Sequence, residues 1–437
     1  MGDLPGGGVF AVELMTSAMI NLFKQRRGRM SSKKLVSFLC VLGLTAGMLA
    51  GCGQSSSVSS EDTAASTTEN TADASGSGDE STDKVYIGQV AAQTGTNKAS
   101  GEMLINGAQL AVDEINAAGG ILGKQVELVV ADEIDNLQAS VNATNKLLSN
   151  DSLTAIVGTN LSQNILAVTD AVEAAKIPYI ACGSNNLIAE EGNPYIWQPR
   201  NLDNIGADII AKYAYETLGI ENPVILYSTI PNAMGPGEQV VAYYEENYRI
   251  TIPTEMQIGY SEEEKNFAPI IAQIQASGAD GLIHIGNVNP AVLISTAIAN
   301  AGLDIPKISN AGILSNILLE NAGAAANGWY ATCDWFATLD TEVGSKFQEN
   351  YKAKYGQDTE MANAVTYDGV YLIKEACEIA GTTTDREAIN NAMQEIADFE
   401  GVLGTYNYHE DHTFLNEFYM TQIQDQVVTL VDQVKYR

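Results

Sequence analysis

Residues 85–131 read VYIGQVAAQTGTNKASGEMLINGAQLAVDEINAAGGILGKQVELVVA, and this stretch decides the class of fold. An apolar run from 85 to 92 is followed by apolar residues at the spacing of one helix face: Leu104, Ala108, Ala111, Val112 and Ile115. Gly119 and Gly120 then end the helix, and a second apolar run covers 126–131. This order predicts parallel strands, because a chain needs a crossover before it can add a parallel neighbour.

The same alternation continues along the chain. Further strands are expected at 153–157, 177–182, 223–227, 280–285 and 307–308, with β-like runs at 402–408, 417–423 and 427–434. Helices are expected at 137–148, 165–175, 205–218, 239–248, 267–276, 289–301, 341–355, 361–380 and 385–397.

The pattern predicts an α/β fold of two doubly wound parallel-sheet lobes joined by a hinge of several crossovers. Lobe 1 is expected to comprise 84–203 plus 331–410, and lobe 2 to comprise 204–330 plus 411–437. A ligand is expected between the lobes, where loops follow the carboxyl ends of strands. These loops are 93–101, 158–163, 182–187, 228–237, 286–290, 309–314 and 333–336.

The first 83 residues are typical of export and tethering. Two lysines precede an apolar run from 35 to 50, which has the length of a secretory signal and is short for a membrane span. The tetrad 49–52, Leu-Ala-Gly-Cys, resembles the lipobox of bacterial lipoproteins. We expect 1–51 to be leader and signal peptide, Cys52 to carry the lipid anchor, and 52–83 to be a disordered tether.

The composition excludes several classes of function. The chain has 437 residues and a net charge of -31, and both nucleic acid and anionic membrane surfaces require a basic face instead. Three histidines, no CxxC pair and no nucleophile-elbow, P-loop or zinc-protease motif predict no enzyme, no cofactor and no metal site. Cys182, Cys333 and Cys377 are an odd set, which favours small buried hydrophobes over a disulfide plus a free thiol.

Four short motifs give residues 84–437 a family resemblance. They are Gln93-Thr94-Gly95, the string AVDEINAAGGILG at 111–123, Ile156-Val157-Gly158 and Gly401-Val402-Leu403-Gly404. Together they resemble the type I periplasmic solute-binding proteins of branched-chain amino acid ABC transporters, in the lipid-anchored form made by Gram-positive bacteria. The resemblance implies a monomer that captures an amino acid or similar solute outside the cell and delivers it to a permease and its ATPase. A ligand-sensing ectodomain that serves a membrane receptor is the alternative.

The resemblance also places candidate ligand-binding residues. Ser162 begins a helix, where its hydroxyl and free backbone N–H groups favour a carboxylate, although capping of its own helix is the alternative. In the next loop the family uses a backbone carbonyl, here Gly183, and a hydroxyl, here replaced by Asn185, for which turn formation is the alternative. The full candidate set is Ser100, Asn160, Ser162, Gly183, Ser184, Asn185, Met234, Asn287, Val288, Asn310 and Ala311.

Lobe 2 departs from the family pattern in two ways. The glutamate with which the family pairs the ligand ammonium aligns with Ala311, and a desolvated ammonium without a carboxylate is costly. The aromatic wall positions align with Met234 and Val288. The candidate loops offer asparagines instead, which favour a neutral amide-bearing or polar solute as an alternative to a branched-chain amino acid, although asparagine is also common in turns. These are Asn160, Asn185, Asn186, Asn287, Asn289 and Asn310. Asp334 or Asp368 could replace the missing acid, although a surface or fold-stabilising role is favoured for Asp368.

Overall fold

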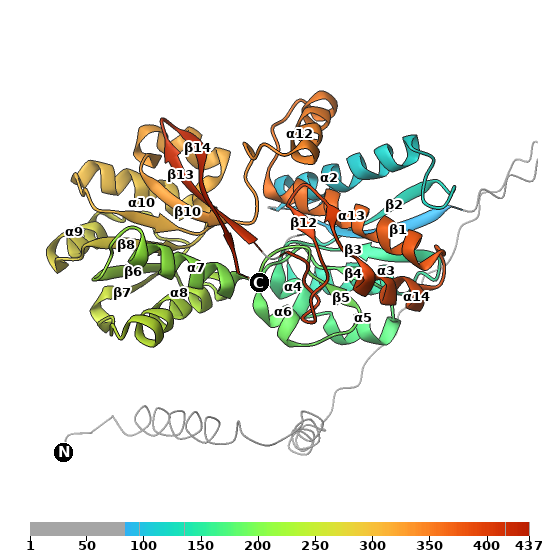
Figure 1. Cartoon of the computed structure of the whole chain (residues 1–437), viewed down its shortest axis with the longest axis horizontal. Helices are drawn as coiled ribbons and strands as arrows, with labels where there is room; N and C mark the ends of the chain where they lie inside the picture. Colours follow the sequence, from blue (N-terminus) through green and yellow to red (C-terminus); the bar gives the residue numbers. More distant parts are fainter. Residues whose placement is uncertain (1–83, 96, 135, 416, 437) are drawn as a thin grey trace, which may run out of the picture. The chain divides into compact units, whose positions relative to one another are not determined.

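The structure, a computed structural model, describes residues 84–436 apart from 96, 135 and 416 (Figure 1). The predicted signal peptide, the lipid anchor at Cys52 and the tether lie outside these residues. Within the described part, no helix combines the length and the apolar character that crossing a bilayer requires. Cys182, Cys333 and Cys377 are buried free thiols, as the sequence predicts.

The first sheet contains five parallel strands in the order β2-β1-β3-β4-β5. Ile156 and Val157 are adjacent in β3 but belong to two separate hydrophobic clusters, because successive side chains point to opposite faces of a sheet. Both faces are therefore covered, as in doubly wound folds. The strands are β1 (Val85–Ala91), β2 (Val126–Asp132), β3 (Leu153–Val157), β4 (Tyr179–Ile180) and β5 (Ile196–Trp197).

Helices from two distant parts of the chain cover this sheet. The crossovers between its strands supply α2 (Lys98–Ala117), α3 (Leu137–Leu148), α4 (Ser162–Leu166), α5 (Thr169–Ala175) and α6 (Asn186–Glu190). The late segment adds α12 (Glu342–Tyr355), α13 (Met361–Ala380), α14 (Arg386–Ala392) and the short pair β11 (Phe399–Glu400) and β12 (Thr405–Tyr406).

The second sheet has seven strands in the order β14-β13-β10-β9-β8-β6-β7. Five of them are parallel and repeat the strand order of the first sheet, whereas β13 and β14 are antiparallel and extend it beyond β10. Asp425 and Gln426 join β13 to β14 with positive φ at both positions, which is the geometry of a type I′ hairpin turn. The sheet is thus mixed rather than wholly parallel.

The second sheet and the helices packed on it, called the second unit below, follow the same alternation of strand and helix as the first sheet and its helices, called the first unit. Its strands are β6 (Pro223–Ser228), β7 (Gln257–Tyr260), β8 (Gly281–Ile285), β9 (Lys307–Ser309), β10 (Trp329–Cys333), β13 (Glu417–Gln424) and β14 (Val427–Lys435). Its helices are α7 (Asp203–Glu216), α8 (Pro231–Tyr243), α9 (Ala268–Ser277), α10 (Val288–Ala301) and α11 (Asn316–Ala322), with short helical turns at Tyr244–Tyr248, Thr254–Met256, Ala311–Leu314 and Gly323–Ala326.

Several predicted boundaries were wrong. The helix predicted at 165–175 begins at Ser162 and breaks after Leu166, where the Thr169 hydroxyl bonds to the Ile165 carbonyl at 3.3 Å and competes with the helical ladder. The helix predicted at 239–248 begins at Pro231 and continues through Pro236. Strand β10 was not predicted, and the proposed boundary between 330 and 331 falls inside it.

The string at 111–123 that carries the family resemblance is bonded within the fold. Glu114 on α2 accepts from Asn350 at 2.7 Å and from the Tyr367 hydroxyl at 2.6 Å, so it joins α2 to α12 and α13. Asn116 exchanges two hydrogen bonds with the backbone of Val126, at 2.9 and 2.7 Å, and fixes the start of β2. Glu114 and Asn116 therefore hold α2 to β2 and to two of the helices that cover the first sheet.

Side-chain bonds tie together the segments that connect the two sheets. Arg200, which precedes α7, donates two hydrogen bonds to Asp334, which directly follows β10, at 2.8 and 3.0 Å. Asn201 donates to the Glu417 carbonyl at 2.6 Å and accepts from the Tyr436 hydroxyl at the same distance. The connecting segments at 200–201 and 334 are therefore bonded to each other, to the start of β13 and to the residue that follows β14.

Candidate functional site

A small cavity lies where the first sheet reverses its strand order. The loops after β1 and β3 diverge at the carboxyl edge of the sheet, and a cavity of about 30 Å³ is located there. Two predicted ligand-binding residues line it, and Asn160 Nδ2 donates to Ser100 Oγ at 3.5 Å. The lining residues are Ala92, Asn97, Ser100, Gly101, Leu104, Glu133, Asn160 and Leu161.

Sequence reasoning missed Glu133, the charged residue of this cavity. It follows β2 and is only 2% exposed. Its carboxylate accepts from the hydroxyls of Thr159 and Ser140 at 2.7 and 2.8 Å, and from Asn164 Nδ2 at 2.9 Å. The signal was available, because β2 is parallel to β1 and its following loop must reach the same edge of the sheet.

The predicted anion-binding serine lies at the start of α4. Ser162 Oγ accepts from the Asn185 backbone N–H at 3.4 Å, so the structure brings these two predicted residues together. A Cβ at Gly183 would lie 2.5 Å from Ser162 Oγ, which means that only glycine leaves this hydroxyl in place. The close approach fixes the position of Ser162 relative to the loop after β4.

Other groups of the protein already occupy the acceptors of that loop. The Gly183 carbonyl accepts from Gln198 Nε2 at 3.0 Å, and the Ser184 carbonyl accepts from the Asp203 N–H at 2.9 Å. Asn185 Oδ1 accepts from the Leu187 N–H at 2.9 Å, so Asn185 caps α6. The turn role that was the alternative for Asn185 is therefore present in the structure.

The candidate residues of the second unit lie near the carboxyl ends of its parallel strands. Met234, in α8, is 40% exposed, and Asn287, which precedes α10, is exposed. Val288 begins α10, and both Val288 and Ala311 are half-buried. They follow β6, β8 and β9, as doubly wound topology requires.

A buried chain of hydrogen bonds fixes the orientation of Asn310. The Tyr260 hydroxyl lies 2.8 Å from His284 Nε2, and His284 Nδ1 lies 2.9 Å from Ser309 Oγ. Ser309 Oγ donates to Asn310 Oδ1 at 3.3 Å, and the Gly286 N–H donates to the same oxygen at 3.2 Å. Since the Gly286 N–H can only donate, its partner is the amide oxygen. Asn310 is thus left with the donors of its Nδ2 group.

His284 should make the stability of the second unit depend on pH. Burial lowers the pKa of His284 to about 3, against an ordinary value near 6.5. Between these values the unfolded chain binds a proton that the folded chain does not, so stability falls as the pH falls. From pH 6.5 to 4.5 this histidine should remove about 2 to 3 kcal/mol of unfolding free energy. Urea unfolding at the two pH values measures the loss.

The His284→Gln variant is the comparison for this prediction. Its own stability can differ from that of the wild type at every pH, so the relevant quantity is the loss between pH 6.5 and 4.5. That loss should be smaller in the variant by about 2 to 3 kcal/mol. Equal losses in both proteins would show that His284 is not held neutral in the folded state.

The two acids considered as replacements for the missing glutamate are bonded within the protein. Asp334 is 2% exposed and pairs with Arg200. Asp368 accepts from the backbone N–H groups of Val402 and Leu403 at 2.8 and 2.9 Å, and from the Tyr406 hydroxyl at 2.8 Å. Burial raises the pKa of Asp368 to about 6 despite these bonds, and its contacts hold the 401–406 turn.

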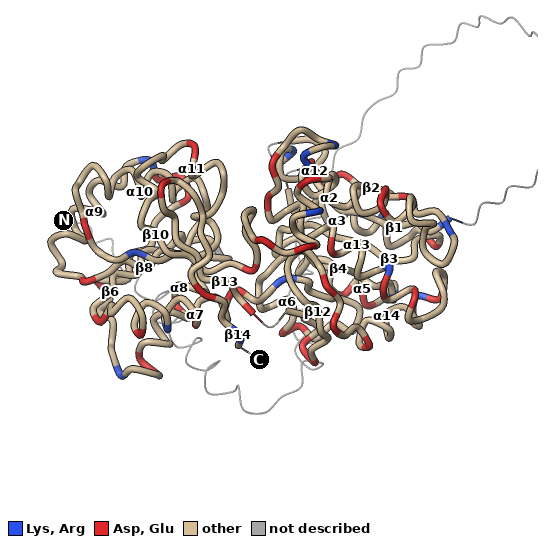
Figure 2. Tube along the Cα trace, turned by 45° about the horizontal axis from the view of Figure 1, so that its top comes forward, with Lys and Arg blue, Asp and Glu red and all other residues tan. Residues whose placement is uncertain are grey.

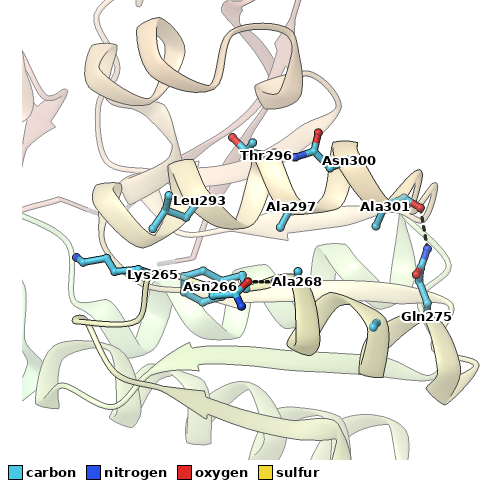
Figure 3. A pocket seen from close by; sticks show the side chains of 11 residues that line it. Lys265, Asn266, Ala268, Gln275, Leu293, Thr296, Ala297, Asn300 and Ala301 are labelled. Carbon is cyan, nitrogen blue, oxygen red and sulfur yellow. Dashed lines mark hydrogen bonds between the residues drawn. The ribbon is translucent and has the colours of Figure 1, made fainter.

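A larger hollow lies away from the predicted residues, between α9 and α10. Its volume is about 380 Å³, and Figure 3 shows aliphatic and small polar side chains on both helices. Gln275 Nε2 donates to the Ala301 carbonyl at 3.0 Å across one end of it. Lys265 is its one charged lining residue, and no candidate ligand-binding residue borders it.

Acidic residues are spread over the elements of both sheets, as Figure 2 shows. The described part of the chain presents few basic positions between them (Figure 2). No group of three or more His, Cys, Asp or Glu side chains in this part is arranged to hold a metal ion.

Comparisons with known proteins agree on one family. A family model described as periplasmic binding protein matches residues 84–427. The Leu/Ile/Val-binding protein homolog 8 of Brucella abortus is 27% identical over 332 residues, which cover 71% of this chain and 80% of that protein. A leucine-binding protein of Thermotoga maritima has a TM-score of 0.71 at 23% identity, with 80% of this chain and 99% of that chain covered. The branched-chain amino acid transporter substrate-binding protein of Streptococcus pneumoniae, solved with isoleucine, has a TM-score of 0.70 at 25% identity and the same coverage.

Proposed function

The chain belongs to the periplasmic binding protein family, and we propose that it is the extracytoplasmic solute-binding component of an ABC importer. It captures an amino acid or amino-acid-like solute between its lobes and delivers it to a permease driven by an ATPase. The observation that carries the proposal is the position of Ser100, Asn160 and Ser162. They lie at the carboxyl edge of the first sheet, beside the reversal of strand order where open α/β sheets bind ligands.

The size of the cavity at this edge supports capture by both lobes. Sites for small molecules generally enclose about 300 to 1,000 Å³, so a cavity of about 30 Å³ receives only a part of the solute. The rest is covered from the second lobe, and a solute that contacts both lobes selects a closed arrangement that the permease recognises. The covering residues in this proposal are Met234, Asn287, Val288, Asn310 and Ala311.

Ser162 is the proposed anchor for a carboxylate of the solute. Gly183 and the Asn185 N–H fix the position of its hydroxyl oxygen, which leaves the hydroxyl hydrogen to donate. Hydrogen bonds to charged groups contribute more than those between neutral groups, about 1.5 to 3 kcal/mol. One well-placed hydroxyl can therefore contribute a substantial part of the affinity.

The solute class need not be that of the named relatives. The names of those proteins refer to leucine, isoleucine and valine or to branched-chain amino acids. In this chain Ala311 stands where the resemblance places an acid that would face the ligand ammonium, and the neighbouring Asn310 has its Nδ2 donors left over. Asn160 and Asn287 add polar groups at the carboxyl ends of their strands. The proposal is therefore an amino acid or related polar solute, with no assumption of branched-chain specificity.

The amino-terminal sequence supports attachment to the outer face of the membrane. The lipobox-like tetrad ending at Cys52 would supply a lipid anchor, and residues 52–83 would supply the tether. Acyl chains at a single residue suffice for anchoring, so this arrangement needs no spanning helix. The tether and the lipobox support a Gram-positive origin, and the proposal takes the protein to act as a monomer.

The Ser162→Ala variant tests the function. We expect calorimetry with a panel of the proteinogenic amino acids and their amides to show saturable binding of at least one of them to the full chain. Loss of the Ser162 hydroxyl should weaken that binding by about 1 to 3 kcal/mol, or about 5- to 150-fold, because the solute carboxylate loses a charged hydrogen bond.

Ser152→Ala is the matched control. Ser152 is exposed and precedes β3, at the opposite end of the strand from Ser162, so its loss should leave the affinity unchanged. Wild-type protein that binds no member of the panel would contradict the proposed function. Binding that survives Ser162→Ala at full strength would place the carboxylate anchor elsewhere.

A further inference from the structure

The cavity beside Asn160 contains a buried charge without a cationic partner. Glu133 is 2% exposed, and the donors it meets are two hydroxyls and one side-chain amide, all of them neutral. Among the described residues, no lysine or arginine forms an ion pair with it. A buried carboxylate without a cation leaves a negative field in its surroundings, and a cavity on one side of it admits a compensating group.

The carboxylate also has capacity for another donor. An ionised carboxylate offers about four acceptor positions, and three are occupied here. Thr159 bonds to one oxygen, whereas Ser140 and Asn164 share the other. The oxygen that meets Thr159 alone can therefore take a further hydrogen bond.

The volume of the cavity limits what can enter. About 30 Å³ exceeds the space that one water needs and is far below that of a whole amino acid. A terminal group with one heavy atom and its hydrogens, such as an ammonium or an amide NH₂, has a suitable size. The polar lining residues Asn97, Ser100 and Asn160 suit such a group better than a methyl group.

Resting on the function proposed above, we propose that this cavity is a subsite for an amino group of the solute, with Glu133 as its acceptor. The second sheet gives independent support, because Ala311 supplies no acid there and Asn310 Oδ1 is occupied by two donors. A carboxylate in the first lobe thus takes the place of one in the second. The group bound is either the α-amino group or an amino group at the far end of a side chain.

Four probes with one carbon skeleton separate these two sources. Hexanoate has no amino group, L-norleucine has the α-amino group alone, 6-aminohexanoate has the terminal group alone, and L-lysine has both. The same four combinations on a five-carbon chain allow for a different distance to the cavity. Calorimetry with the full chain should show that adding one of the two amino groups tightens binding by about 10- to 100-fold, as expected for a charged hydrogen bond.

Glu133→Gln should remove this preference, so that probes with and without the relevant amino group differ by less than about threefold. Glu173→Gln is the matched control, because Glu173 lies on α5 of the same unit, is exposed and does not line the cavity. Ser100→Leu tests the same point without touching the three donors of Glu133, since the larger side chain fills the cavity. Thermal unfolding confirms that each variant is folded, and Ser100→Leu replaces Glu133→Gln if the latter is not.

Three results would overturn the proposal. Wild-type protein that binds isoleucine or another amino acid of the panel but gains nothing from either amino group would refute the Glu133 subsite and leave the proposed function standing. An amino-group preference that survives in folded Glu133→Gln and Ser100→Leu proteins would likewise refute the subsite and leave the proposed function standing. Protein that binds none of these compounds and no proteinogenic amino acid would refute the proposed function and the subsite together.

Discussion

Replacing Asp334 by asparagine should lower the free energy of unfolding by about 3 kcal/mol at pH 7. The side chains of Arg200 and Asp334 are only 18% and 3% exposed, so the substitution leaves a guanidinium largely buried without its carboxylate. The two hydrogen bonds, at 2.8 and 3.0 Å, join segments 134 residues apart in the chain. Urea unfolding monitored by circular dichroism measures the loss.

Asp358→Asn is the control for charge removal. Asp358 pairs with Lys352 at 2.6 Å, but both side chains are 65% exposed, and such surface pairs contribute at most about 1 kcal/mol. Both variants remove one acid from an already acidic chain. The difference between their losses of unfolding free energy therefore reports the effect of burying the ion pair. A loss in Asp334→Asn no larger than in Asp358→Asn would mean that the pair does not hold the connecting segments together.

Replacing Gly107 by alanine should destabilise the protein by a similar amount, about 3 kcal/mol. Gly107 lies on α2 against α13, and a Cβ there would be 2.1 Å from the Asn363 carbonyl oxygen and 2.7 Å from the Asn363 Cα. Because these atoms belong to backbone, the helices themselves must move apart. The shift would also disturb the hydrogen bond of 2.8 Å from Thr366 to the Leu104 carbonyl.

Gly235→Ala should raise the free energy of unfolding, whereas Gly107→Ala should lower it. Gly235 lies within α8, its φ is not positive, and a Cβ there would meet nothing within 4 Å. Alanine is favoured over glycine in a helix by up to about 1 kcal/mol, so this variant should be slightly more stable than the wild type. Thermal and urea unfolding of both variants measure the contrast. Equal effects would show that close packing of α2 on α13 does not govern the Gly107 result.

Much of the fold could be predicted because it depends on local periodicity. Residues 137–148 and 153–157 were placed at their observed bounds, since a helix face and a short apolar run are both visible in a few residues. Strand β10 reads Trp-Tyr-Ala-Thr-Cys, which has neither a continuous apolar run nor a clear alternation, so no strand pattern marks it in the sequence. Helix α8 was cut short because Gly235-Pro236-Gly237 is typical of a turn, whereas its packing against β6 maintains a helix.

The candidate site was predictable only where position in the topology suffices. Ser100 and Asn160 belong to two loops that the topology places at the carboxyl ends of strands, and they meet at the cavity. Asp334 was considered as a ligand for the solute, but its partner Arg200 is 134 residues away, and no local pattern reveals such a pair. The loop after β2 could have been placed at this edge from the topology, but only the folded chain shows which of its two neighbouring acids, Asp132 or Glu133, is buried.

Glu114 and Asn116, within the 111–123 string, form hydrogen bonds with α12, α13 and β2. These two side chains therefore hold the scaffold together, and neither lines the cavity of the candidate site. The presence of this string in a chain therefore indicates the scaffold and does not indicate which solute is bound. Under the subsite proposed above, the side chains at positions 100, 133 and 160 would distinguish the solutes that such proteins bind.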